Sequence, residues 1–351
     1  MSQQVGLEIP RGRGVNRLRA MGRFAIMLIK IGKSVGMRVS SRGWCYLLEG
    51  FRLINKDQFD MVETLINECR KYGFLPIDFV AEEESRGFSG VEKPEDIDPV
   101  GYMKRFLVAT QQCGDWYTPD WWDGEEYYIQ MVVEKIDLKT LFKPLCEEYH
   151  IPIATAKGWS SMLQRAEYAR RFRMAEEKGL KCVLLYCGDH DPDGLRISEF
   201  LRSNLKELAN IRWADGAEGY DPKDLKIDRF GLNFDFIEAN NLTWIDNLIT
   251  GSGKNLASPS HKNHDLQYVQ DYLRDIGERK CEANALVVAR AASEDLCRQA
   301  IEAYLGDDAL GRFQEKRDTV LEELEDFREK SGVGKAVKDA IDLIDKERER
   351  T

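Results

Sequence analysis

Two aspartates near the middle of the chain, Asp189 and Asp191, have the residue type and the spacing to bind a metal ion. They follow an apolar run at residues 182–185, typical of a buried strand, and precede Pro192 and Gly194, which open a helical pattern. Side chains two residues apart in extended backbone point the same way. Paired carboxylates repel each other unless a hard cation lies between them. The spacing therefore predicts a site for Mg²⁺, with Mn²⁺ as the other ion to test.

A second strand, upstream, supplies a further carboxylate. Residues 127–135 are rich in aromatic and β-branched side chains and bring Glu134 to the end of the run. The segments between the two strands are expected to form a helix, a strand and a helix at residues 138–149, 151–155 and 157–177. This alternation predicts an α/β fold with a parallel sheet and crossover helices. Because functional groups collect beyond the carboxyl ends of such strands, Glu134 joins Asp189 and Asp191 as an expected metal ligand.

Three residues near this edge have competing interpretations. Asp193 is either an additional metal ligand or the N-cap of the helix that begins at Gly194, and the capping role is preferred. His190 could contact a phosphate, although a residue at such a point more often fills a turn position. Glu134 could be one solvated acid among many, but its place at a strand end favours the metal site.

The order of these residues resembles a known family. A Glu at a strand end, a later turn at Gly158 and then Asp-x-Asp-Pro resemble the Toprim domain of topoisomerases, primases and several nucleases. The details are most similar to the DNA-cleaving subunit of topoisomerase VI and to the meiotic double-strand-break transesterase. Their Asp-Gly-Asp-Pro turn corresponds to residues 189–192, with His190 in place of the glycine. Two later segments also resemble the family, at residues 240–242 and 280–286. The resemblance spans roughly residues 14 to 300.

The resemblance also implies a nucleophile. Residues 39–46 are similar to the family's Arg-x-x-x-Tyr signature in a winged-helix domain, with Arg42 and Tyr46 in the two signature positions. In the family this Tyr attacks DNA and forms a 5′-phosphotyrosyl link. A phenol has a pKa of about 10, so its phenolate needs a nearby cation, which Arg42 would supply from one helical turn away. Cys45 stands where the family often has a second aromatic residue.

Three functions are compatible with the sequence. The first is metal-dependent DNA cleavage by a protein similar to the DNA-cleaving subunit of topoisomerase VI, with Tyr46 as nucleophile. The second is a Toprim nuclease of a defence, plasmid or phage system that hydrolyses DNA with a metal-activated water. In that case Tyr46 is an ordinary half-buried aromatic residue. The third is a non-catalytic DNA-binding scaffold, which the clustered carboxylates disfavour because a scaffold gains nothing from them.

A basic block near the N-terminus is a candidate DNA-contacting surface. Residues 11–42 include nine Lys and Arg residues and no Asp or Glu, although the chain of 351 residues has a net charge of −10. Such a block can contact the phosphates of DNA. The alternative is a disordered basic tail followed by one amphipathic helix. The expected DNA-binding residues are Arg11, Arg13, Arg17, Arg19 and Arg23 of this block, and Lys157 at a later helix start.

Composition favours a cytoplasmic location, associated with the nucleoid in a bacterium or archaeon. No apolar run is long enough to cross a bilayer, no secretion signal is evident, and the eight cysteines include no Cys-x-x-Cys pair. The expected parts are a basic flexible arm, a winged-helix-like DNA-binding domain, a linker, a Toprim domain and C-terminal helices, at residues 1–13, 14–90, 91–124, 125–305 and 306–351.

Double-stranded DNA is the expected substrate, and no membrane is expected to be involved. The resemblance implies a homodimer, since the Tyr of one protomer would serve the metal site of the other and give staggered cuts. No ATPase motif is present, because the segment at residues 251–254 lacks the spacing of a phosphate-binding loop. Strand passage would therefore need a separate ATPase subunit.

Overall fold

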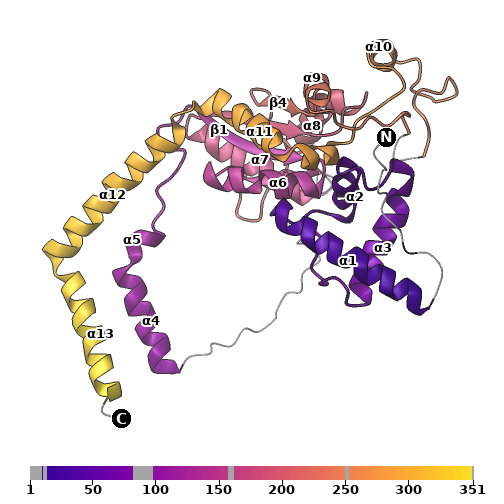
Figure 1. The fold of residues 1–351 in the computed structure, drawn as a ribbon. Coiled ribbons are helices and arrows are strands. Elements are labelled where there is room, and N and C mark those ends of the chain that lie inside the picture. Colours follow the sequence, from indigo (N-terminus) through magenta and orange to yellow (C-terminus); the bar gives the residue numbers. More distant parts are fainter. Residues whose placement is uncertain (1–9, 11–13, 82–97, 157–161, 250–252, 350–351) are drawn as a thin grey trace. The chain divides into compact units, whose positions relative to one another are not determined.

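The computed structural model describes Pro10 and residues 14–81, 98–156, 162–249 and 253–349. Its backbone contacts divide the chain into two compact units (Figure 1). The first unit combines Met1–Glu83 with Glu126–Tyr304, and the second combines Glu84–Glu125 with Leu305–Thr351. All the residues expected to do chemistry belong to the first unit.

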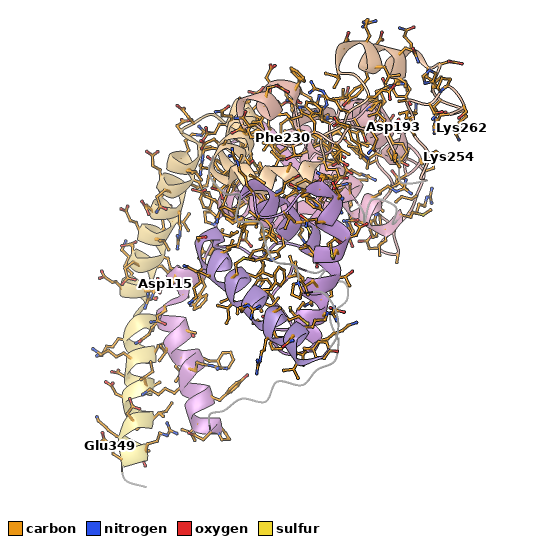
Figure 2. All side chains as sticks on the ribbon, turned by 45° about the vertical axis from the view of Figure 1, so that its right-hand side comes forward. Asp115, Asp193, Phe230, Lys254, Lys262 and Glu349 are labelled. Carbon is orange, nitrogen blue, oxygen red and sulfur yellow. The ribbon has the colours of Figure 1, made fainter. Side chains whose placement is uncertain are left out.

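A four-stranded parallel sheet forms the centre of the first unit. Its strands lie in the order β2-β1-β3-β4 and are β1 (Tyr127–Val133), β2 (Ile153–Thr155), β3 (Lys181–Cys187) and β4 (Lys226–Gly231). The α/β class and the parallel sheet predicted from the sequence are confirmed. β1 and β3 are apolar along most of their length because both are inner strands that are covered on both faces. Phe230, near the end of β4, lies among the packed side chains of this unit (Figure 2), with its ring 5.8 Å from that of Phe142.

The connections between the strands define where a ligand can bind. Helix α6 (Ile136–Glu148) leads from β1 to β2, α7 (Met162–Glu177) from β2 to β3, and α8 (Ile197–Lys206) from β3 to β4. The connection after β1 therefore runs to β2 at one edge of the sheet, and the connection after β3 runs to β4 at the other edge. Right-handed crossovers in opposite directions put their helices on opposite faces, which opens a crevice between the carboxyl ends of the two strands. Glu134 and Asp189 follow β1 and β3 at this crevice.

Helices make up the N-terminal part of the first unit. They are α1 (Val15–Val35), α2 (Ser41–Gly50), the 3₁₀ turn η1 (Lys56–Gln58) and α3 (Phe59–Lys71). No strand is assigned between residues 14 and 81. After β4 the same unit continues with α9 (Phe234–Ala239), α10 (Gln267–Asp275), η5 (Ala283–Ala289) and α11 (Arg290–Leu305). η5 packs against both α2 and α6, which joins the N-terminal helices to the sheet.

A buried carboxylate also holds α2 on the sheet side of the unit. Asp137, in the first turn of α6, is fully buried and accepts hydrogen bonds from the backbone N–H and from the hydroxyl of Ser40, the latter at 2.5 Å. Ser40 is the N-cap of α2 and accepts the N–H of Gly43 at 3.1 Å. A Cβ atom on Gly43 would lie 2.8 Å from Asp137 Oδ2, so this close approach requires glycine.

The described residues of the second unit are mainly helical. The helices are α4 (Pro99–Gln111), α5 (Cys113–Trp116), α12 (Ala309–Ser331) and α13 (Val333–Glu349). α4 and α13 lie side by side, and Lys104 Nζ pairs with Asp345 Oδ1 at 2.5 Å. The segment expected as a linker, residues 91–124, thus contains α4 and α5 in its described part. Across the described ranges, no helix combines the length and the apolar character needed to cross a membrane.

The contact between α2 and α6 gives a stability prediction. Asp137→Ala removes the acceptor of two Ser40 donors and should lower the free energy of unfolding by about 2 to 3 kcal/mol, because both donors stay partly buried. Urea unfolding followed by circular dichroism measures this change. The control is Asp224→Ala, whose side chain is 76% exposed and whose effect should stay within about 0.5 kcal/mol. Equal midpoints for wild type and Asp137→Ala would contradict the assigned role.

Candidate functional site

The register of β1 and β3 places two of the expected metal ligands next to each other. Val133 pairs with Cys187, and the N–H of Glu134 donates to the carbonyl of Cys187 at 2.9 Å. Gly188 separates β3 from Asp189, and a Cβ atom there would lie 2.7 Å from Glu134 Oε2. The absence of a side chain at this position therefore allows the Glu134 carboxylate to reach the Asp189 loop.

Each of the two carboxylates has one oxygen held by a backbone N–H. Glu134 Oε2 accepts the N–H of Asp189 at 2.7 Å, and Asp189 Oδ1 accepts the N–H of Ala283 at 2.7 Å. The other oxygen of each carboxylate faces the same ammonium group. Lys135 Nζ lies 2.6 Å from Glu134 Oε1 and 2.9 Å from Asp189 Oδ2. The fold thus fixes two oxygens and directs the other two at one cation.

The two carboxylates differ in acidity although both face the same cation. Burial, reinforced by the charge of Glu134, raises the pKa of Asp189 above its usual value. Burial also acts to raise the pKa of Glu134, but the charge of Lys135 and the N–H of Asp189 outweigh it and lower that pKa. Burial acts to lower the pKa of Lys135, yet the two carboxylates outweigh it and raise it well above the ordinary lysine value. The lysine is therefore a permanent cation at neutral pH.

The side chains of Asp191, Asp193 and His190, in the loop after β3, make hydrogen bonds within the protein. Asp191 Oδ1 accepts the N–H of Gly194 at 2.7 Å, so Asp191 caps the short 3₁₀ helix η4 (Gly194–Arg196). Asp193 is the N-cap residue of this helix, as predicted, but its side chain makes no cap hydrogen bond. Asp191 lies two residues earlier, and its carboxylate reaches forward to the N–H of Gly194. His190 is buried, and its Nδ1 lies 3.1 Å from the hydroxyl of Tyr272.

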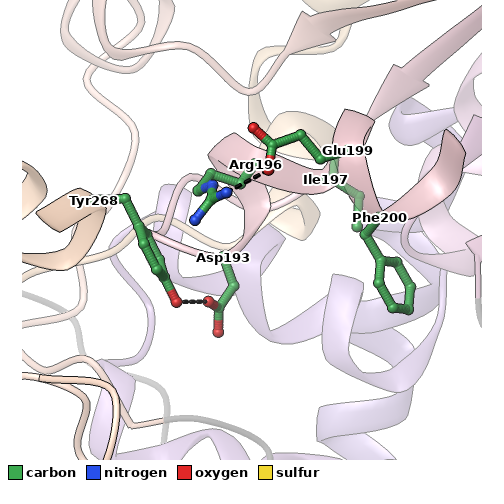
Figure 3. Close-up of a pocket in the computed structure, with 6 residues that line it drawn as sticks. All are labelled: Asp193, Arg196, Ile197, Glu199, Phe200 and Tyr268. Carbon is green, nitrogen blue, oxygen red and sulfur yellow. Dashed lines mark hydrogen bonds and ion pairs between the residues drawn. The ribbon is translucent and has the colours of Figure 1, made fainter. Parts of the chain in front are cut away.

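A pocket of about 550 Å³ opens beside Asp193 (Figure 3). The hydroxyl of Tyr268 donates to Asp193 Oδ1 at 2.9 Å, and the guanidinium of Arg196 lies 4.6 Å from the centre of the Tyr268 ring. Arg196 also pairs with Glu199, and Phe200 lines the opposite part of the pocket in this view. Asp193 is therefore engaged with Tyr268 and does not face Lys135 with the other two carboxylates.

One arginine holds the backbone of the loop at residues 188–195 in place. Arg229 of β4 donates from Nη2 to the carbonyls of Asp189 at 3.0 Å and Leu232 at 2.7 Å. Its Nε donates to the carbonyl of Gly194 at 3.0 Å, and its Nη1 donates to Asn233 Oδ1 at 2.7 Å. A guanidinium has five donors in a rigid plane, which suits it to fix several acceptors at once.

The candidate nucleophile lies in the interior of the same unit. The Tyr46 side chain is 1% exposed, and its hydroxyl donates to Glu282 Oε2 at 2.6 Å. Arg42 Nε lies 3.8 Å from the same Glu282 oxygen, and Lys56 Nζ lies 4.1 Å from the centre of the Tyr46 ring. Burial and the anionic Glu282 raise the pKa of Tyr46 far above that of a free phenol, although Arg42 acts against them. Glu282 directly precedes Ala283, which binds Asp189.

The expected DNA-binding residues divide into two groups. Arg17 forms an ion pair with Glu68 at 2.5 Å, whereas Arg19 and Arg23 are exposed on α1. Arg11, Arg13 and Lys157 lie outside the described residues. One stripe of exposed positions, four and three residues apart along α1, contains Arg19, Arg23, Ile26, Lys30 and Lys33. Side chains at this spacing share one face of a helix, so α1 presents a basic face.

The donor set suits a hard divalent cation in part. Glu134 and Asp189 direct two carboxylate oxygens at one cation, which are the ligands Mg²⁺ prefers. Asp191 is nearby in sequence but is used for the turn. In the part of the chain that the structure describes, no three His, Cys, Asp or Glu side chains are grouped to hold a metal ion. Glu134 and Asp189 thus have the oxygen ligands that a metal ion needs, and in this structure the ammonium of Lys135 lies between those oxygens.

Comparisons of the sequence with models of protein families and with curated proteins give no match.

Several contributors to this site had only weak signals in the sequence. Lys135 directly follows Glu134, and a lysine beside an acidic ligand is the one hint of its role. Arg229 lies in a strand with Lys226 and Asp228, whose polar pattern does not predict a strand. Lys56 follows Asn55, the N-cap of η1, and would be taken for a solvated first-turn residue.

The role of Arg229 gives a prediction for the order of the loop. Arg229→Met should lower the free energy of unfolding by about 3 kcal/mol, because several buried carbonyls lose a charged donor. Amide hydrogen exchange over residues 188–195 should also become faster. Arg274→Met is the matched control, since that side chain is 66% exposed and its loss should leave the free energy of unfolding close to that of wild type. Unchanged exchange in the loop of Arg229→Met would refute the role.

Proposed function

We propose that this chain is a metal-dependent DNA-cleaving protein whose metal ligands are Glu134 and Asp189, with Asp191 as a further candidate. The observation that carries the proposal is the convergence of Glu134 Oε1 and Asp189 Oδ2 on a single cation. It occurs between the carboxyl ends of β1 and β3, where the strand order reverses and α/β proteins bind their ligands. A divalent ion bound there would supply positive charge to polarise a scissile phosphate and to stabilise the leaving 3′ oxygen.

The Toprim and winged-helix assignments belong to the same proposal. The parallel sheet with acidic residues after β1 and β3 supports a Toprim domain over residues 125–305. Helices α1, α2 and α3 support the helical part of a winged-helix-like domain over residues 14–90. A homodimer is part of the proposal. Exposed apolar side chains on α4, such as Phe106 at 56% exposure, are compatible with a further partner. A place at the nucleoid and a separate subunit with ATPase activity remain parts of the proposal that rest on the resemblance.

Hydrolysis by water is the cleavage reaction that the geometry favours. In it the water oxygen forms a bond to phosphorus as the bond from phosphorus to the 3′ oxygen breaks. Tyr46 is poorly placed to act instead of water in this arrangement, because its hydroxyl is buried and hydrogen-bonded to Glu282. A phosphate that approached Tyr46 would also meet the negative charge of Glu282.

Transesterification by Tyr46 is the second candidate, and Lys56 is the observation in its favour. The Lys56 ammonium lies over the rings of Tyr46 and Phe59, and among the described residues it makes no hydrogen bond. Together with Arg42 it gives Tyr46 two neighbouring cations, which a phenolate needs. In this reaction Tyr46 Oη would form the bond to phosphorus and leave a 5′-phosphotyrosyl link and a free 3′ hydroxyl.

The first experiment separates these reactions. Supercoiled plasmid is incubated with the full chain and Mg²⁺ or Mn²⁺, stopped with SDS and analysed for cuts and for protein bound to DNA. Loss of a residue that only supports a metal ligand slows an enzyme by about 10- to 100-fold. Because Asp189 is proposed to bind the metal itself, Asp189→Asn should slow cleavage by more than this. Tyr46→Phe should keep cleavage within a few-fold of wild type and give no covalent product, as expected for hydrolysis.

The controls assign every outcome of this assay. Asp224→Asn, at an exposed acid far along the chain from the loop, should cut like wild type. Covalent protein–DNA product that is lost in Tyr46→Phe would replace hydrolysis by transesterification. Failure of wild type to cut any plasmid with either ion would contradict the catalytic proposal and favour the DNA-binding scaffold.

The basic face of α1 gives a prediction for DNA affinity. From Arg19 to Lys33 the helix rises by about 21 Å, enough to follow several phosphates of one strand. The triple variant Arg19→Gln, Arg23→Gln and Lys30→Gln should reduce the slope of log K against log salt by about 3, since each lost phosphate contact contributes about 0.9. Fluorescence anisotropy with a short duplex at several salt concentrations measures the slope.

A matched variant controls for net charge. The triple substitution Lys206→Gln, Lys223→Gln and Arg274→Gln removes the same charge from exposed positions elsewhere in the unit. It should change the slope by much less than the α1 variant. Equal effects of the two variants would mean that α1 is not the DNA-contacting face.

A further inference from the structure

Lys135 occupies the place that the proposed metal ion would need. Its ammonium nitrogen is within 2.9 Å of one oxygen from each carboxylate, Glu134 Oε1 and Asp189 Oδ2. The remaining oxygen of each carboxylate is already bound to a backbone N–H, from Asp189 and from Ala283. The two oxygens that could bind a divalent ion are therefore the two that bind the lysine.

An ammonium group and a divalent ion cannot both stay at this point. Mg²⁺ binds carboxylate oxygens at about 2.0 to 2.1 Å, so it would lie between the oxygens that now contact Lys135 Nζ. At such separations two positive charges in a partly buried site repel each other strongly. The side chain of Lys135 is 31% exposed, more than that of either carboxylate at 26% and 12%. The lysine can thus leave toward solvent while the two acids stay in place.

We infer that Lys135 is a tethered counter-ion of the metal site, so that a divalent ion binds Glu134 and Asp189 only by displacing it. The inference rests on the proposed function for the identity of the ligand. It assigns to Lys135 two effects that a purely structural lysine would not have. It holds the two acids together before metal binds, and it weakens metal binding by competing for the same oxygens.

Mn²⁺ titration of the full chain without DNA tests the inference. Binding is measured by calorimetry and by the paramagnetic resonance signal of free aqueous Mn²⁺. Lys135→Met should bind Mn²⁺ about tenfold or more tightly than wild type, because the competing charge is gone. Lys135→Arg keeps the charge and should bind no more tightly than wild type. Lys143→Met, in the helix α6 that follows Lys135, removes a lysine paired with Glu147 and should match wild type.

Thermal unfolding gives a second readout that does not depend on affinity alone. Without metal, Lys135→Met should melt at a lower temperature than wild type, because two neighbouring carboxylates lose their counter-ion. Mn²⁺ should raise the melting temperature of Lys135→Met more than that of wild type. If Lys135→Met does not fold without metal, Lys135→Gln serves in its place, and folding on addition of Mn²⁺ supports the inference.

The outcomes separate this inference from the proposed function. Equal or weaker Mn²⁺ binding by Lys135→Met than by wild type overturns the inference, even if the protein cuts DNA. Tighter binding by Lys135→Met that is lost again on adding Asp189→Asn supports it, even if no DNA is cut and the proposed function fails. Absence of Mn²⁺ binding by both wild type and Lys135→Met at millimolar metal overturns both.

Discussion

The repulsion between two carboxylates at the carboxyl ends of β1 and β3 is the constraint on which the rest of the site depends. The pairing of Val133 with Cys187 is set by apolar side chains in the sheet, and it brings Glu134 and Asp189 together. Two like charges in a partly buried position repel each other by several kcal/mol. The surrounding contacts supply the compensation: backbone N–H groups hold one oxygen of each acid, and the ammonium of Lys135 joins the other two. Buried acids are compatible with a stable fold only when they are paired and hydrogen-bonded in this way.

Distant parts of the chain contact the loop that follows β3. Arg229, from β4, binds the carbonyls of Asp189, Leu232 and Gly194. Ala283, at the start of η5, supplies the N–H that fixes Asp189. The backbone of Cys281 pairs with that of His190. The position of the Asp189 carboxylate is therefore determined by strand β4 and by the segment before η5 as much as by the strand it follows.

The α/β fold and the meeting of Glu134 with Asp189 could be predicted from the sequence because they depend on local patterns. An apolar run that ends in an acid predicts a buried strand with the acid at its carboxyl end, and parallel strands share that edge. Contacts between remote segments left no such pattern. The acceptor of the Tyr46 hydroxyl is Glu282, which is 236 residues away, and nothing around residue 46 indicates this contact. Asp191 and Asp193 were hard to tell apart because both precede a helix start, and only the turn geometry decides which carboxylate reaches the Gly194 N–H.

The segment at Glu282 and Ala283 links the two possible reaction chemistries. Ala283 binds Asp189, and the Glu282 carboxylate binds the hydroxyl of Tyr46, so the proposed metal ligand and the phenol are fixed by adjacent residues. Burial raises the pKa of Tyr46. Burial also acts to raise the pKa of Glu282, but the Tyr46 hydroxyl, Arg42 and Lys56 outweigh it and lower that pKa. A free phenol is already far less acidic than a free glutamic acid, and both shifts act in the direction that keeps the proton on Tyr46. Attack by Tyr46 would require its separation from Glu282 while Arg42 and Lys56 stay near it. Hydrolysis at Glu134 and Asp189 needs no such rearrangement of α2, and for that reason the geometry of the single chain favours water as the nucleophile.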